Sequence, residues 1–134
     1  MEENERELLE FLQRIESDYP GLLIVVEGNR DEDILRDLGV QSEIIKTQAG
    51  RPRPELIDHI ADEAQSERPI LILTDFDREG REMARFIELE LEIRKIQTLR
   101  RVRRRIRDLM SNLRCIEELV SLLKRRDFPG RPYL

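Results

Sequence analysis

The sequence has few of the residues that build disulfide-bonded, zinc-binding or membrane proteins. Its 134 residues include one cysteine, one histidine and no tryptophan. A single thiol, Cys115, cannot form an internal disulfide or a cysteine-rich zinc site, which indicates a reducing compartment. The longest apolar run, Leu22–Val26, is far too short to cross a bilayer, and the acidic start lacks a signal peptide. We therefore expect a cytoplasmic protein without a membrane segment.

Glycine and proline are also scarce, with six of each, so long irregular segments are not expected. Charged residues make up 40% of the chain and hydrophobic residues 39%. The charges have both signs and the apolar residues recur periodically, which is typical of a folded, helix-rich protein. The length of 134 residues corresponds to one domain with a core of ordinary size.

Short apolar segments alternate with amphipathic ones along the first two thirds of the chain. Strands are expected at 22–26, 43–46 and 70–74, and helices at 5–18, 32–37 (capped by Asp31), 55–65 and 82–91. This order predicts an α/β fold with a central parallel sheet and flanking helices. Beyond Leu91, apolar residues recur every three or four positions as far as Leu123. That pattern predicts a helical extension with a break at an undetermined position, and it leaves open a short strand near 93–98.

Acidic residues follow two of the predicted strands at the point where each strand ends. Glu27 comes directly after the strand at 22–26, and Asp75 and Asp77 follow the strand at 70–74. Since ligand sites of open parallel sheets lie at the carboxyl ends of strands, these acids converge if the strands are neighbours. Grouped carboxylates repel one another unless a hard cation shares them. The sequence therefore predicts one or two Mg²⁺ ions, with Mn²⁺ as a substitute, and metal-assisted phosphoryl transfer.

Two motifs carry a resemblance to a known family. The run Val-Val-Glu27-Gly28, followed about fifty residues later by Thr-Asp75-x-Asp77-x-x-Gly80, resembles the Toprim domain of topoisomerases, bacterial-type primases and several nucleases. The resemblance covers roughly residues 22 to 91 and implies a three-layer Toprim-like fold. It also implies that Glu27 is a general acid/base or a metal ligand. Asp75 and Asp77 would hold Mg²⁺, and Gly28 and Gly80 would shape the turns.

Parts that the sequence lacks exclude several kinds of Toprim protein. It has no room for the tyrosine-bearing domain of a topoisomerase or the added parts of a primase, and its one cysteine excludes the zinc site of a recombination mediator. What remains is similar to the small stand-alone Toprim proteins, and this resemblance implies a nuclease that acts on RNA or DNA. One departure is that Asn29-Arg30 stands where many primase-like and nuclease members carry a lysine after the Glu-Gly pair.

The chain then divides into four segments. These are an N-terminal helix (1–20), a Toprim core (21–92), a basic amphipathic helical extension packed on the core (93–127) and a tail (128–134). The apolar seam of the extension offers a surface for a homodimer or for another protein partner.

Basic and small residues near the acids are candidates for substrate binding. They are Gly28, Arg30, Arg51, Arg53, Gly80 and Arg81. In addition, eight basic residues lie between Arg94 and Arg107 without an intervening acid. This strip is either a solvated helix face or a surface for a phosphate backbone, and no aromatic residue interleaves it for base stacking.

The sequence predicts Mg²⁺-dependent phosphodiester chemistry on RNA or DNA, with Glu27, Asp75 and Asp77 as the catalytic residues. Two alternatives stay open. One is a non-catalytic metal- and nucleic-acid-binding module of a replication or RNA-processing complex. The other is a small-molecule phosphotransferase, which the salt dependence of binding distinguishes, since only polymer binding weakens steeply with salt.

Overall fold

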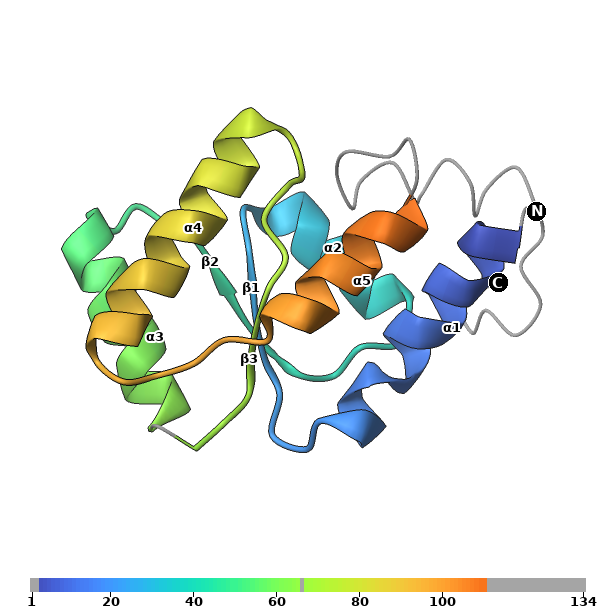
Figure 1. The fold of residues 1–134 in the computed structure, drawn as a ribbon, viewed down its shortest axis with the longest axis horizontal. Helices are drawn as coiled ribbons and strands as arrows, with labels where there is room; N and C mark the ends of the chain where they lie inside the picture. Colours follow the sequence, from blue (N-terminus) through green and yellow to red (C-terminus); the bar gives the residue numbers. More distant parts are fainter. Residues whose placement is uncertain (1–2, 66, 111–134) are drawn as a thin grey trace.

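The computed structural model describes residues 3–65 and 67–110, which form alternating helices and strands (Figure 1). In chain order the elements are α1 (Glu3–Asp18), β1 (Leu23–Val26), α2 (Asn29–Asp37), β2 (Glu43–Lys46), α3 (Arg53–Ala64), β3 (Ile70–Ile72), α4 (Arg78–Ile93) and α5 (Arg100–Met110). Each strand and helix expected before Leu91 is present, with differences at the ends.

The strands form one parallel sheet in the order β2-β1-β3. In its register, Ile24 of the central strand lies between Ile44 on β2 and Leu71 on β3. All of β1 is buried, as its continuous apolar run predicts for a strand covered on both faces. The α/β fold with a central parallel sheet is therefore confirmed.

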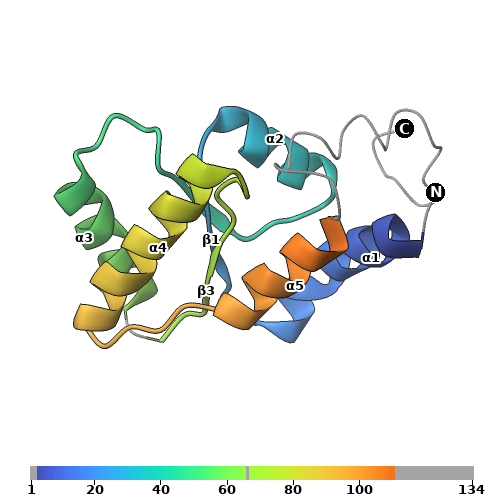
Figure 2. The same cartoon turned by 45° about the horizontal axis from the view of Figure 1, so that its top comes forward.

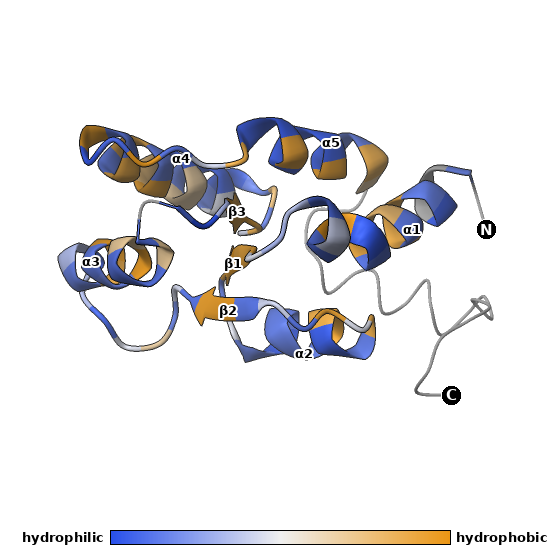
Figure 3. Ribbon diagram, turned by 90° about the horizontal axis from the view of Figure 1, so that it is seen from below, coloured by the Kyte–Doolittle hydropathy of each residue, from blue (hydrophilic) through white to orange (hydrophobic). Residues whose placement is uncertain are grey.

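Helices cover both faces of this sheet, so the molecule has three layers (Figures 2 and 3). Residues Ile24 and Val26 of β1 pack with α1, α2 and α5 on one face. Leu23 and Val25 pack with α3 and α4 on the other face, as the alternation of side chains along a strand requires. Among the described residues, no helix is long and apolar enough to cross a membrane.

All four expected helices begin earlier than the apolar pattern predicts, and the difference is largest for α2 and α4. Helix α4 begins at Arg78 because the Asp77 carboxylate accepts the N–H of Gly80 at 2.8 Å and caps the helix. The expected helix start at position 82 was therefore four residues too late. Helix α2 begins at Asn29, so Asp31 lies in its first turn and does not cap it from outside. The Asp31 carboxylate instead reaches back to accept the N–H of Gly28 at 3.1 Å.

The long helical pattern after Leu91 is interrupted between Ile93 and Arg100. In this connection the N–H of Leu99 donates to the carbonyl of Ile70 at 2.8 Å, so the chain lies along the outer edge of β3. Residues 3–65 and 67–110 contain no fourth strand there. Helix α5 then packs on α1 and β3. Val102, Ile106 and Leu109 of the predicted apolar seam pack in the core. The predictions for 111–127 and 128–134, including Cys115 and the rest of the seam for a homodimer, lie outside the described residues.

Candidate metal centre

Three carboxylates meet at the carboxyl edge of the sheet. Glu27 directly follows β1, and Asp75 and Asp77 follow the neighbouring strand β3. One carboxylate oxygen of each residue lies within 4.8 Å of those of the other two. Because β1 and β3 are adjacent and parallel, both strands deliver their next residues to the same edge. The structure thus brings together the three residues that the sequence predicts to be catalytic residues and metal ligands.

Backbone hydrogen bonds fix the direction of two of these carboxylates. The N–H of Asp75 donates to Oε2 of Glu27 at 2.8 Å, and the N–H of Gly80 donates to Oδ1 of Asp77 at the same distance. Each bond engages one carboxylate oxygen and thereby orients the other. The buried Thr74 hydroxyl donates to the carbonyl of Gly80 at 2.7 Å, which ties the strand end to the first turn of α4.

Gly80 is required because that turn packs directly on the backbone of Asp75. A Cβ atom at position 80 would lie 2.0 Å from the Asp75 carbonyl oxygen, so no larger residue fits without a shift of the backbone. The role of Gly80 is therefore close backbone packing, which brings Asp77 next to the end of β3.

The carboxylates affect one another electrostatically. The pKa of Glu27 is raised, mainly by burial. The hydrogen bond from Asp75 lowers this pKa, whereas the negative charges of Asp77, Asp31 and Glu79 raise it further. A divalent cation would relieve this repulsion. Three hard oxygen donors in one place also match the ligand preference of Mg²⁺ and Mn²⁺. The residues present therefore fit such an ion.

An open cavity of about 290 Å³ adjoins the cluster. Its lining consists of Glu27, Gly28, Asn29, Arg30, Asp31, Gln48 and Asp75. Two of the residues predicted to bind substrate, Gly28 and Arg30, thus lie beside the carboxylates. Sequence reasoning missed Asn29 and Gln48 as site residues. Gln48 is the second residue after β2, and its N–H donates to the Glu27 carbonyl at 2.9 Å. A search of the first two residues after each strand would have found it.

The other three arginines predicted to bind substrate do not line this cavity. Arg51 is exposed in the loop before α3. The guanidinium of Arg53 lies 4.9 Å from the ring centre of Phe86, between α3 and α4. Arg81 donates to the carbonyl of Phe76 at 2.9 Å and lines a second cavity, which lies between α4 and α5.

Arg103, one residue of the basic strip, is buried and forms hydrogen bonds with the backbone that carries Asp75. Its guanidinium donates to the carbonyls of Ile72 and Thr74, each at 2.9 Å, and to that of Asp75 at 3.2 Å. It also lies 4.4 Å from the ring centre of Phe76. These bonds satisfy carbonyls at the end of β3 and in the residues just after it.

Burial lowers the pKa of Arg103 to about 10, so the guanidinium stays charged at neutral pH. The sequence contains one signal for this role. Position 103 lies one helical turn from Leu99 and Ile106, on the side of α5 that faces the core.

Fold and site together define a small α/β protein with an acidic cluster at the carboxyl edge of a parallel sheet. No family model matches the chain. The chain is 37% identical over 121 residues to a UPF0292 protein of Thermococcus gammatolerans, which covers 90% of this chain and 86% of the relative. It is 36% identical to UPF0292 protein MJ1624 of Methanocaldococcus jannaschii, over 90% of this chain and 93% of the relative. The chain therefore belongs to the UPF0292 family.

One solved structure shares the fold. It is described as a putative protein from Aquifex aeolicus, and it superposes with a TM-score of 0.65 at 18% sequence identity. The match covers 84% of this chain and 95% of that one. At this identity the similarity shows the fold alone, so the function is argued from the site.

Proposed function

We propose that this protein is a Toprim-type nuclease that uses Mg²⁺ to cleave phosphodiester bonds of RNA or DNA at the acidic cluster. The observation that carries the proposal is the convergence of Glu27, Asp75 and Asp77, with ligand oxygens within 4.8 Å of one another. The ends of neighbouring parallel strands supply these acids, which is where α/β sheets bind their ligands.

The side chains have distinct roles in this proposal. Asp75 and Asp77 hold the ion, and Mg²⁺ bound there would offset negative charge on the phosphate group. Burial raises the pKa of Glu27 above its ordinary value, which favours a role for this carboxylate in accepting and returning a proton. Arg30, beside the carboxylates in the same cavity, supplies a positive charge for the substrate. Arg103 is a positioning residue, since it holds the backbone of Asp75.

The experiment is cleavage of end-labelled structured RNA and DNA in Mg²⁺, with EDTA as the metal-free control. We expect the wild type to cut one of the two polymers. Glu27→Gln should slow cleavage by about 100- to 10,000-fold, the usual contribution of a general acid or base, and Asp75→Asn should abolish it. Glu82→Gln is the matched control, because Glu82 is exposed on α4, outside the cluster, and it should cut like the wild type.

Two results would replace this function with another. If the wild type binds Mg²⁺ through Asp75 and binds polynucleotide without cutting it, a non-catalytic binding module takes the place of the nuclease. If it transfers phosphate only from nucleotides and ignores polymers, the protein is a small-molecule phosphotransferase.

A further inference from the structure

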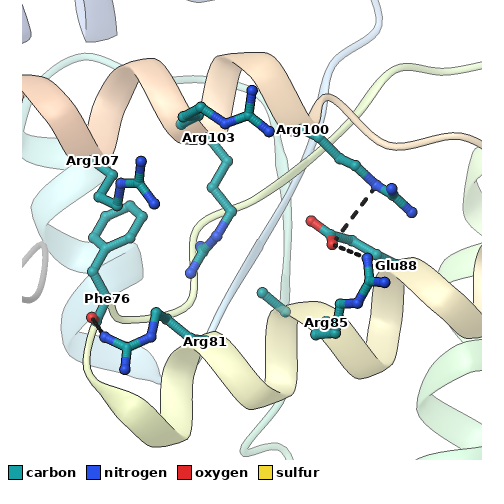
Figure 4. Close-up of a pocket in the computed structure, with 9 residues that line it drawn as sticks. Phe76, Arg81, Arg85, Glu88, Arg100, Arg103 and Arg107 are labelled. Carbon is teal, nitrogen blue, oxygen red and sulfur yellow. Dashed lines mark hydrogen bonds and ion pairs between the residues drawn. The ribbon is translucent and has the colours of Figure 1, made fainter.

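Helices α4 and α5 enclose a second cavity of about 250 Å³, which we call the arginine groove (Figure 4). Its charged lining consists of Arg81, Arg85, Glu88, Arg100, Arg103, Arg104 and Arg107. It shares one loop with the candidate metal centre, since Asp75 lines the acidic cavity and Phe76 lines the groove. The two cavities therefore lie next to each other.

The arginines reach the groove because of helical spacing. Positions 100, 103, 104 and 107 form one face of α5, and positions 81 and 85 lie one turn apart on α4. Figure 4 shows side chains from both helices pointing into the space between them. Like charges one turn apart destabilise an isolated helix. Helix formation therefore does not explain why these arginines gather on one face.

Their charge is only partly balanced within the molecule. Glu88 is the one acid of the groove, and its carboxylate lies 4.0 Å from Arg85 and 3.7 Å from Arg100. Arg81 and Arg103 donate to backbone carbonyls, which carry no net charge. Residue Arg104 has no ion pair within residues 3–65 and 67–110.

Two other ion pairs involve groove arginines, but they are exposed. Arg100 also pairs with Glu92 at 3.0 Å, and Arg107 pairs with its neighbour Asp108 at 3.3 Å. Exposed pairs of this kind contribute little and exchange readily for another anion. The groove is thus a positive surface in a chain whose formal net charge is −5.

We infer that the arginine groove binds the phosphate backbone of a polynucleotide, and, resting on the proposed function, that this strand continues into the metal centre. One guanidinium group can donate two parallel hydrogen bonds to one phosphate group. A row of guanidinium groups therefore suits a ligand with repeated phosphates. The Phe76 ring is buried beneath Arg103 and cannot stack on a base. Binding should therefore follow the backbone and be independent of sequence.

The test is fluorescence anisotropy with labelled oligonucleotides of several lengths, in EDTA, over a range of salt concentrations. The test variant is Arg104→Gln/Arg107→Gln, on the groove face. The control is Arg101→Gln/Arg105→Gln, on the same helix with the same change in charge. Neither control residue lines the groove, and Arg105 pairs with Glu7 of α1. Thermal melts of both variants verify that they fold.

We expect the groove variant to bind roughly tenfold to a hundredfold more weakly near 0.1 M salt, with a salt slope lower by about two. The control should bind like the wild type, and affinity should rise with oligonucleotide length. Equal losses in the two variants would overturn the inference. Displacement by inorganic phosphate, with no effect of length, would also overturn it in favour of a small phosphate ligand.

This test is independent of catalysis. EDTA removes the metal, and Asp75→Asn should bind the oligonucleotide at least as tightly as the wild type in EDTA, because it removes a negative charge. If the groove binds polynucleotide but the wild type never cuts it, only the proposed nuclease activity fails. If Mg²⁺-dependent cutting persists in the groove variant with unchanged affinity, only the groove inference fails.

Discussion

The candidate metal centre and the arginine groove share one loop but concentrate opposite charges. In the first, Glu27 and Asp77 each accept a backbone N–H, from Asp75 and Gly80. In the second, Arg81 and Arg103 donate to backbone carbonyls. Backbone dipoles thus hold like charges together on both sides. The difference is that the groove attracts a phosphate directly, whereas the carboxylates attract one only through a cation.

Loss of Arg103 should remove the hydrogen bonds that join the arginine groove to the backbone of the metal centre. Of the changes considered, it should lower the stability most. Arg103→Met leaves the carbonyls of Ile72, Thr74 and Asp75 without their donor. We expect a loss of about 2–4 kcal/mol in the free energy of unfolding, measured by urea denaturation. The control, Arg104→Met, changes an exposed residue of the same helix and should stay within about 0.5 kcal/mol of the wild type. Equal values for the two variants would contradict the structural role of Arg103.

A smaller loss should follow from forcing apart the loop and α4. Gly80→Ala places a Cβ atom 2.0 Å from the carbonyl oxygen of Asp75, so the backbone must move. We expect a loss of about 1–3 kcal/mol, again from urea denaturation. Gly28→Ala is the comparison, because its Cβ meets only the flexible tip of Gln48 at 3.2 Å. If Gly80→Ala is no more destabilising than Gly28→Ala, the close packing of α4 on Asp75 is wrong.

The smallest expected change in stability comes from the electrostatic repulsion within the acidic cluster. The folded protein raises the pKa of Glu27 above its usual 4.5, so the folded state holds this proton more tightly than the unfolded chain. The wild type therefore loses stability as the pH rises from 4.5 through the raised pKa. Glu27→Gln lacks this loss and keeps an oxygen to accept the N–H of Asp75.

Thermal melts of the wild type and Glu27→Gln between pH 4 and pH 7 would measure this effect. Without divalent ions, the variant should melt at a higher temperature near pH 7, and the difference should vanish below the usual glutamate pKa. Added Mg²⁺ should then raise the melting temperature of the wild type more than that of the variant. A variant that is less stable at pH 7 would show that repulsion does not dominate at Glu27.

The strands and the three acids follow from local sequence. A continuous apolar run such as Leu22–Val26 identifies a buried strand, and the polar residue after it falls at the sheet edge. That rule identifies Glu27, Asp75 and Asp77 without knowledge of the long-range contacts. The helix starts are less predictable, because Asp77 has the same sequence appearance in a turn as in a helix cap.

The arginine groove depends on contacts between distant parts of the chain. Arg103 bonds to Ile72, which is 31 positions earlier, and only the position of the break after Ile93 decides which arginines of α5 face α4. Helical periodicity groups positions 100, 103, 104 and 107. It does not reveal which element that face meets, so the sequence leaves the basic strip open between a solvated face and a binding surface.

The measurement that tests the metal centre most directly is a titration with Mn²⁺, in which electron paramagnetic resonance quantifies the free ion. The wild type should bind one or two ions, and Mg²⁺ should displace them. Asp75→Asn/Asp77→Asn should lose this binding, whereas Glu82→Gln should retain it. A wild type that binds no ion, or a double variant that binds Mn²⁺ as tightly as the wild type, would contradict the metal site on which the proposed nuclease depends.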